Sequence, residues 1–369
     1  MQDRTTHHRA KGPRRAPRIA GMAIAAALLA AFGQGAGHDA GHGAGHGALA
    51  AEPERKEVRL AVGSVIMNYM PVGLTVALDH FRKEGLTVTV ENFQAGGSKA
   101  LQAMLGGSVD VVVGAYDHTI QMQAKGKEIA CVVQLNTRPG NSLGVRADLA
   151  DKVRSGKDLK GLRIGITTPG SSADMAVRYY LARNGVAARD ARIIAVGSGS
   201  PGMVALENNN IDALLYWDPV ATLLLQKNAV KVLFDARTAA GNKDAFGSED
   251  SPFACLYAPK AFIETNPETT QRLVDAFIRT LRFIASQPAA SVVDALPDNW
   301  KLPNQRDLNI AIMEASRGMF STDGRTDPKG AEVPLAILSG FDETIKPETI
   351  DLSRTYTNRF VEEAARRIP

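Results

Sequence analysis

The stretch RIGITTPGSSADMAVRYYLARNG, residues 163–185, contains a strand pattern and a helix pattern separated by a few polar residues. Its apolar start predicts a β-strand, and the helix pattern begins directly after TTPGSS, residues 167–172. Hydroxyl side chains and a glycine at such a junction leave several backbone N–H groups unpaired beside a helix N-terminus. The junction is therefore predicted to bind a small anion or polar group.

A second junction of similar build lies upstream. The residues AGGS, 95–98, precede the helix pattern KALQAMLGG. Ligands of open α/β sheets bind outside the carboxyl ends of the strands, so both junctions should face one cleft. Two such junctions predict capture of a solute between two lobes.

Strand and helix patterns alternate along most of the chain from residue 57. This alternation predicts right-handed crossovers and mostly parallel sheets. One helix is expected over residues 70–85 with Gly85 as its C-cap. A return strand is expected within residues 251–262, and an amphipathic helix over 266–289.

The chain has 369 residues, 44% of them apolar, which is more than one domain usually holds. The predicted order has five parts. These are a signal peptide (1–33), a flexible His/Gly-rich linker (34–56), the first part of lobe 1 (57–142), lobe 2 (143–252), and a return strand to lobe 1 with C-terminal helices (253–369).

The N-terminus has the pattern of an export signal. A basic segment, residues 4–18, precedes an apolar run over 19–32 that is too short to span a membrane. Small residues allow cleavage before Gln34 or near residue 50, and no cysteine lies close enough to carry a lipid anchor. We expect a soluble, monomeric protein of the periplasm.

Charge and composition exclude several other classes. The first 33 residues carry a net charge of +5, so the rest of the chain carries −1, and nucleic-acid binding is not expected. The histidines at 38, 42 and 46 lie in a glycine-rich tract that could bind zinc or copper, but a solvated spacer is the favoured interpretation. Cys131 and Cys255 could form a disulfide after export or remain small apolar core residues.

Five strand ends are predicted to line the cleft. Each glycine or serine there could serve loop geometry or helix capping, but their recurrence at one end of the sheets favours ligand contact. The candidate ligand-binding residues are Ser64, Asn68, Gly97, Ser98, Tyr116, His118, Thr168, Gly170, Ser171, Ser172, Trp217 and Asp218.

Three of these candidates have a second interpretation. Trp217 offers a flat wall and an N–H donor, or it fills the core of its lobe. Asp218 accepts a ligand amine or caps the helix that Pro219 opens, with capping favoured. His118 hydrogen-bonds a ligand carboxylate beside Tyr116, or it faces solvent on the first turn of a helix.

Catalytic motifs are absent from the sequence. It has no H-E-x-x-H, G-x-S-x-G or P-loop pattern, and no clustered cysteine pair. GSGSPG, residues 197–202, matches G-x-G-x-x-G, but its helix is too short for a dinucleotide fold. A binding protein without cofactor or metal is therefore favoured over an enzyme.

The segments EVRLAVGS, FRKEGLTVTVENFQAGGSKALQAMLGGSVDVVVGA, DLKGLRIGITTPGSS and ALENNNIDALLYWDP together resemble the periplasmic solute-binding proteins of ABC importers. The resemblance covers about residues 57–290, within the group for nitrate, taurine, aliphatic sulfonates and thiamine-pyrimidine precursors. It implies a bilobed α/β fold of the type II periplasmic-binding-protein class, with two parallel-sheet lobes joined by a hinge. It also implies an ABC permease and ATPase as partners.

Two departures from that group bear on the ligand. Relatives commonly have Glu where this chain has Asp218, and small residues where it has YDH, residues 116–118. The bulkier wall favours an organic anion or aromatic ligand over nitrate. Related thiamine-pyrimidine synthases remain an alternative, although their cysteine-rich metal motif is missing here. A sensory ligand-binding protein is a third possibility.

Overall fold

The computed structural model describes residues 51–368 except Ala95 and Phe341. The expected signal peptide, its cleavage sites and residues 34–50 of the expected linker lie outside the described residues. Within the described part of the chain, no helix is both long and apolar enough to cross a membrane.

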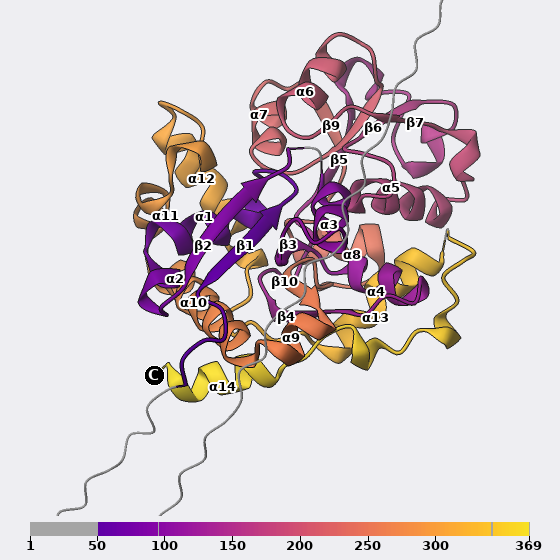
Figure 1. Ribbon diagram of the computed structural model, residues 1–369. Coiled ribbons are helices and arrows are strands. Elements are labelled where there is room, and N and C mark those ends of the chain that lie inside the picture. The colour runs from indigo at the N-terminus through magenta and orange to yellow at the C-terminus, as the bar shows by residue number, and fades with distance from the viewer. Residues whose placement is uncertain (1–50, 95, 341, 369) are drawn as a thin grey trace, which may run out of the picture. The chain divides into compact units, whose positions relative to one another are not determined.

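Two five-stranded sheets form the centres of two lobes (Figure 1). The first sheet has the order β2-β1-β3-β10-β4, and the second has the order β7-β6-β8-β5-β9. The first contains β1 (Glu57–Val62), β2 (Thr87–Asn92), β3 (Val111–Ala115), β4 (Ile129–Gln134) and β10 (Ala254–Pro259). The second contains β5 (Ser142–Arg146), β6 (Arg163–Ile166), β7 (Arg192–Ala195), β8 (Ala213–Tyr216) and β9 (Val230–Asp235).

Each sheet is mostly parallel, as expected, with four strands in one direction and one antiparallel strand. The expected return strand is present as β10, and it runs antiparallel to β3 and β4. In the second sheet β5 runs antiparallel to β8 and β9. The chain crosses between the lobes after β4 and again before β10, and the strand that follows each crossing enters its new sheet in the opposite direction.

Helices flank both sheets, so the central strand β3 is buried at all five positions, as expected of strands covered on both faces. In the first lobe these are α1 (Met70–Ala77), α2 (His80–Lys83), α3 (Gly97–Leu105) and α4 (Asp117–Ala124). In the second lobe they are α5 (Ser172–Arg183), α6 (Ser200–Glu207), α7 (Val220–Gln226) and α8 (Ala239–Phe246).

The prediction of a single helix over residues 70–85 is wrong. The segment forms α1 and α2, because Asp79 adopts a left-handed backbone conformation with a φ of 64°. Aspartate tolerates this conformation better than most residues, and a helix cannot continue through it. Gly85, at a φ of 77°, follows the second helix.

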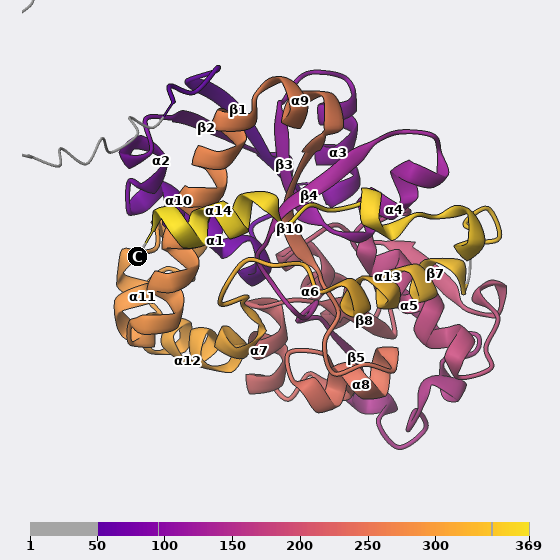
Figure 2. The same ribbon diagram turned by 90° about the horizontal axis from the view of Figure 1, so that it is seen from below.

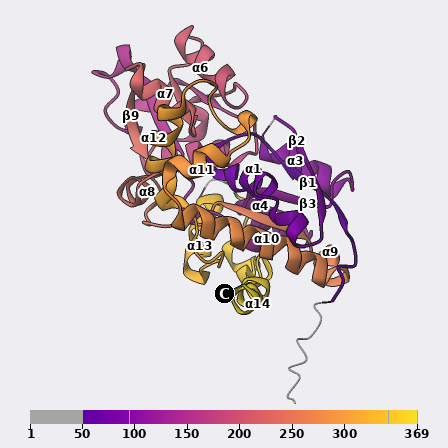
Figure 3. The ribbon, with the colours of Figure 1, turned by 90° about the vertical axis from the view of Figure 1, so that its left-hand side faces the viewer.

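The C-terminal segment forms six helices among the described residues. The long helix α10 lies beside α14 and packs on α1, as Figures 2 and 3 show. Helix α13 contacts α4 of the first lobe and α5 of the second. The six are α9 (Lys260–Thr265), α10 (Pro267–Ser286), α11 (Ala289–Ala295), α12 (Arg306–Ser316), α13 (Pro328–Ser339) and α14 (Arg359–Arg367).

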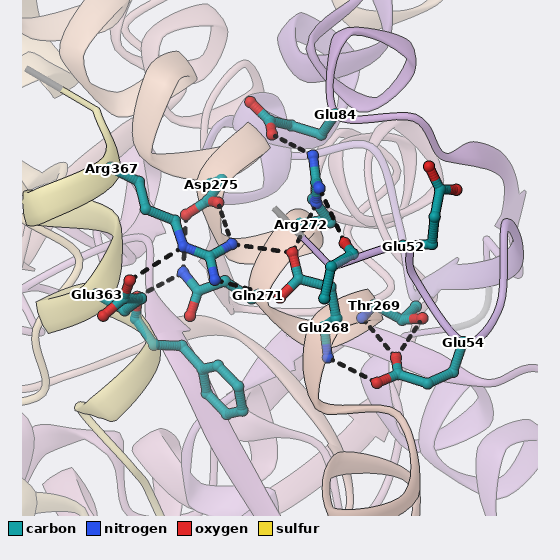
Figure 4. A network of polar contacts seen from close by, with 12 residues as sticks. Glu52, Glu54, Glu84, Glu268, Thr269, Gln271, Arg272, Asp275, Glu363 and Arg367 are labelled. Carbon is teal, nitrogen blue, oxygen red and sulfur yellow. Dashed lines mark hydrogen bonds and ion pairs between the residues drawn. The ribbon is translucent and has the colours of Figure 1, made fainter. Parts of the chain in front are cut away.

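A network of charged side chains joins the segment before β1 to α10 and α14 (Figure 4). The Glu54 carboxylate accepts hydrogen bonds from the backbone N–H groups of Glu268, at 3.1 Å, and Thr269, at 2.9 Å. Arg367 of α14 reaches Glu268 at 2.9 Å and Asp275 at 3.7 Å. Glu54 thus satisfies N–H groups at the start of α10, where a helix has no internal acceptors for them.

Candidate ligand-binding cleft

A cavity opens between the two lobes at the carboxyl ends of their strands. It encloses about 370 Å³ of space, part of it open to solvent, and both lobes contribute to its wall. Its lining residues are Ser64, Ile66, Tyr69, Gly96, Gly97, His118, Thr167, Ser171, Ser172, Ala173, Trp217 and Phe253. We call this cavity the cleft.

The first-lobe wall contains the N-terminus of α3. Its N-cap residue Gly96 has a φ of 91° and provides no side-chain cap. The β1 loop approaches closely, because a Cβ on Gly63 would collide with the Gly97 nitrogen. A helix N-terminus without a side-chain cap keeps backbone N–H groups available for an anion.

The second-lobe wall contains the N-terminus of α5, whose polar groups are largely used within the protein. The Ser171 hydroxyl donates to the Thr168 carbonyl at 2.6 Å and accepts from the Asp174 backbone at 3.4 Å. The Gly170 N–H donates to the Asp174 carboxylate at 3.0 Å. Ser171 therefore caps the helix as well as lining the cleft, and Ser172 is the adjacent hydroxyl in the wall.

The two predicted junctions face one another. The hydroxyls of Ser98 and Thr168 lie 3.3 Å apart. Beside them the Ser198 hydroxyl of the second lobe donates to the Gln94 carbonyl of the first at 3.3 Å. The rims of the two lobes are therefore in direct contact in this structure.

His118 lines the cleft and is buried, so the solvent-facing alternative is wrong. Its Nδ1 lies 3.0 Å from the Tyr257 hydroxyl, whereas its Nε2 has no hydrogen-bond partner among the described residues. Burial lowers the pKa of His118, and the nearby Asp117 opposes that change. Burial therefore favours the neutral imidazole over the charged one.

Aromatic rings form the remainder of the wall. Trp217 stacks on Phe253 with ring centroids 5.9 Å apart, and Phe253 stacks on Tyr69 at 6.4 Å. The Trp217 indole N–H donates to the Pro139 carbonyl at 2.8 Å, so it is not available to a ligand. Trp217 therefore forms part of the cleft wall and also packs in the hydrophobic core, so it has features of both interpretations.

Two candidate residues serve internal contacts instead of the cleft. The Tyr116 side chain is fully buried and does not line the cleft. Its hydroxyl lies 2.6 Å from the Thr355 hydroxyl in the C-terminal segment. Asn68 donates to the Pro139 carbonyl at 2.8 Å, in the first crossing between the lobes. The prediction that Tyr116 lies beside His118 in the ligand wall is therefore not met by this geometry.

Asp218 is also held within the protein. Its carboxylate accepts from the Thr222 backbone at 3.0 Å and pairs with Arg237 at 3.0 Å, and the residue is 1% exposed. The first of these contacts satisfies an N–H in the first turn of α7, as the favoured capping interpretation expects, although the N-cap position itself is Pro219. No local pattern predicts that Arg237 pairs with Asp218, because only the fold brings the two side chains together.

Sequence reasoning missed several lining residues. Ile66 follows the first strand but was not among the candidates, and Phe253 lies where the chain enters β10. The position of the second crossing is the signal that would have pointed to Phe253. Both cysteines are free and buried, and among the described residues no group of three or more His, Cys, Asp or Glu side chains is placed to hold a metal.

Two α/β lobes joined by two crossings, with a cleft at the carboxyl ends of their strands, define the periplasmic binding protein fold. The chain belongs to the NMT1-like family, whose model matches residues 51–295. This match confirms the resemblance to solute-binding proteins drawn from the sequence. Comparison with curated proteins gives no match.

Solved structures agree with this assignment. A protein from Bordetella bronchiseptica RB50 is 35% identical over 86% of this chain and all of its own, with a TM-score of 0.82. The alkanesulfonate-binding protein SsuA from Xanthomonas axonopodis pv. citri, bound to MOPS, is 17% identical, covering 83% of this chain and 99% of its own at a TM-score of 0.65. The periplasmic nitrate-binding protein NrtA from Synechocystis PCC 6803 is 14% identical, covering 86% and 90% at 0.70. At these identities the last two show the shared fold.

Proposed function

We propose that this protein is the substrate-binding component of an ABC importer, exported to the periplasm, which captures a small organic anion between its lobes and delivers it to a membrane permease. The observation that carries the proposal is the cleft itself. It combines the N-terminus of α3, which has no side-chain cap, with the buried Nε2 of His118, which has no partner among the described residues, and both lobes contribute to its wall.

The chemistry of the wall supports an organic anion over a bare inorganic one. Burial raises the pKa of Tyr69, so its hydroxyl stays protonated and can donate. The stacked rings of Phe253 and Trp217 add an apolar surface that an organic body would cover. The sulfonate-binding and nitrate-binding proteins that share this fold provide the two ligand classes to compare.

A thermal-shift screen tests the proposal on the purified protein. Sulfonates, nitrate, dicarboxylates, aromatic acids and pyrimidines are compared, because a ligand that binds only the folded state raises the melting temperature by mass action. An organic acid should give the largest increase, and calorimetry should show one binding site. No increase from any compound would overturn the proposal, and turnover of a compound that binds would favour an enzyme.

A further inference from the structure

A second cavity is built from parts of both connections between the lobes. It encloses about 410 Å³, part of it open to solvent. Pro139 and Asn141 belong to the first crossing, and Ser251 and Phe253 belong to the second, just before β10. Side chains of α4, α5, α8 and α13 complete the wall. We call it the second cavity.

Two buried oxygen atoms in the second cavity accept no hydrogen bond. They are the Oδ1 atoms of Asp117 and Asn141, and neither has a hydrogen-bond partner among the described residues. Asn141 is only 2% exposed. Buried polar atoms of folded proteins almost always have a partner, so two such acceptors in one cavity point to a donor that the protein itself does not supply.

Asp117 also lacks a compensating positive charge. Burial raises the pKa of its carboxyl group, and His118 and a hydrogen bond from Ser172 oppose the rise. His118 is the one titratable group among the described residues that acts on this carboxyl, and burial favours its neutral form. A water molecule would donate a hydrogen bond here but would bring no charge to balance a buried carboxylate, whereas a cation with N–H groups brings both.

The rest of the wall is largely apolar. Its apolar side chains include Met175, Ala176, Phe246, Phe253, Pro334 and Ile337. A hard metal ion prefers a shell of about six or more oxygen ligands, which such a wall does not offer. An alkylammonium ion instead packs its carbon atoms on an apolar surface, and aromatic faces such as those of phenylalanine attract it.

We infer that the second cavity binds a small alkylammonium ion, whose N–H groups donate to Asp117 and Asn141 and whose carbon atoms pack on the apolar wall. The two cavities share Ser172 and Phe253, but Asp117 and Asn141 line only the second. The ion is a ligand in its own right, so the inference does not depend on the solute bound in the cleft. Because both crossings contribute to the wall, the bound ion would contact both connections between the lobes.

Titration with methylammonium chloride tests the inference on the purified protein. The melting temperature is measured at constant ionic strength, with methylammonium chloride replacing sodium chloride. Methylammonium should raise the melting temperature and approach saturation, because a ligand of the folded state stabilises by mass action.

Two other salts serve as controls in the same titration. Tetramethylammonium has the charge and the carbon atoms but no N–H group, and potassium has the charge alone. Neither should give a saturable increase, because neither can donate a hydrogen bond to the two oxygens.

Substitutions locate the bound ion, with affinity measured by calorimetry. Asp117→Asn keeps the side-chain shape and removes the charge, so it should weaken methylammonium binding by about tenfold or more. Asn141→Leu removes the other acceptor at similar size and should weaken it by about two- to twelvefold, which provides a second test if Asp117→Asn folds poorly. Asp151→Asn makes the same change as the first variant at an exposed position and should bind like wild type.

Several results would overturn the inference. Absence of a saturable increase would mean that water satisfies the two oxygens, and an equal increase with potassium or tetramethylammonium would mean that N–H donors are not recognised. Unchanged affinity in a folded Asp117→Asn or Asn141→Leu variant would place the ion elsewhere. None of these results bears on the proposed function, which concerns solute binding in the cleft.

Discussion

The Ser98 hydroxyl of the first lobe lies 3.3 Å from the Thr168 hydroxyl of the second. These residues belong to the two strand-to-helix junctions that the sequence singled out. Their contact joins the rims of the cleft where a ligand would enter or leave. It is therefore a contact of the closed arrangement that opening of the lobes would break.

Ser98→Ala and Thr168→Val should each weaken ligand binding by about two- to twelvefold, because a net hydrogen bond contributes about 0.5–1.5 kcal/mol. The two effects should be non-additive in a double-mutant cycle measured by calorimetry, since both variants remove the same contact. Ser108→Ala, at an exposed position of the first lobe, is the control. Fully additive effects would show that the hydroxyls act independently.

Substitutions of Ser171 and Ser172 should distinguish the effect of helix capping on stability from the effect of ligand contact on affinity. Ser171→Ala removes the N-cap of α5 and should lower the free energy of unfolding by about 1 kcal/mol. Ser172→Ala lacks that role and should lower ligand affinity with a smaller change in stability. Chemical denaturation and calorimetry on both variants measure the two effects. Equal losses of stability would contradict this division.

Asp218 should act mainly through stability. Asp218→Ala leaves the buried Arg237 without one of its two carboxylate partners and should cost about 3 kcal/mol in the free energy of unfolding. Asp148→Ala is the matched control, because its pair with Arg146 has a carboxylate side chain that is 61% exposed and should cost less than about 1 kcal/mol. Loss of ligand binding with unchanged stability would instead place Asp218 in the binding site.

Asp275 of α10 should make stability depend on pH. Burial raises the pKa of its carboxyl group to about 6, with Gln271 and Arg367 opposing the rise. The unfolded chain ionises this group near pH 4, so its contribution is full below pH 4 and is lost as pH rises to about 6. Asp275→Asn should become more stable than wild type across that interval, by about 1–3 kcal/mol at pH 7.

Denaturation curves at pH 4, 5, 6 and 7 measure this difference. Asp151→Asn controls for removal of a surface carboxylate, because Asp151 is exposed. A constant difference between Asp275→Asn and wild type at all four values would contradict the assignment.

Local sequence pattern predicts the order of strands and helices and the two junctions. It also predicts that His118 and Trp217 lie in the cleft. Patterns of apolar residues mark strand ends, and strand ends of such sheets face a common edge. This is why Ser64, Gly97, Ser171 and Ser172 also line the cleft.

What the sequence could not supply are contacts between distant segments. Tyr116 points away because Thr355, in the C-terminal segment, provides its hydrogen-bond partner. The antiparallel direction of β5 depends on where the chain crosses between lobes, which no local pattern records. The Oδ1 atoms of Asp117 and Asn141, which have no hydrogen-bond partner among the described residues, likewise come to line one cavity only when α4, the first crossing and α13 are assembled.

Trp217 connects the second lobe to both crossings at once. Its indole N–H is bound to Pro139 in the first crossing, and its ring lies on Phe253 in the second. The two connecting segments therefore cannot bend separately without breaking a buried contact. An opening of the lobes that keeps both contacts must therefore bend the two connecting segments together.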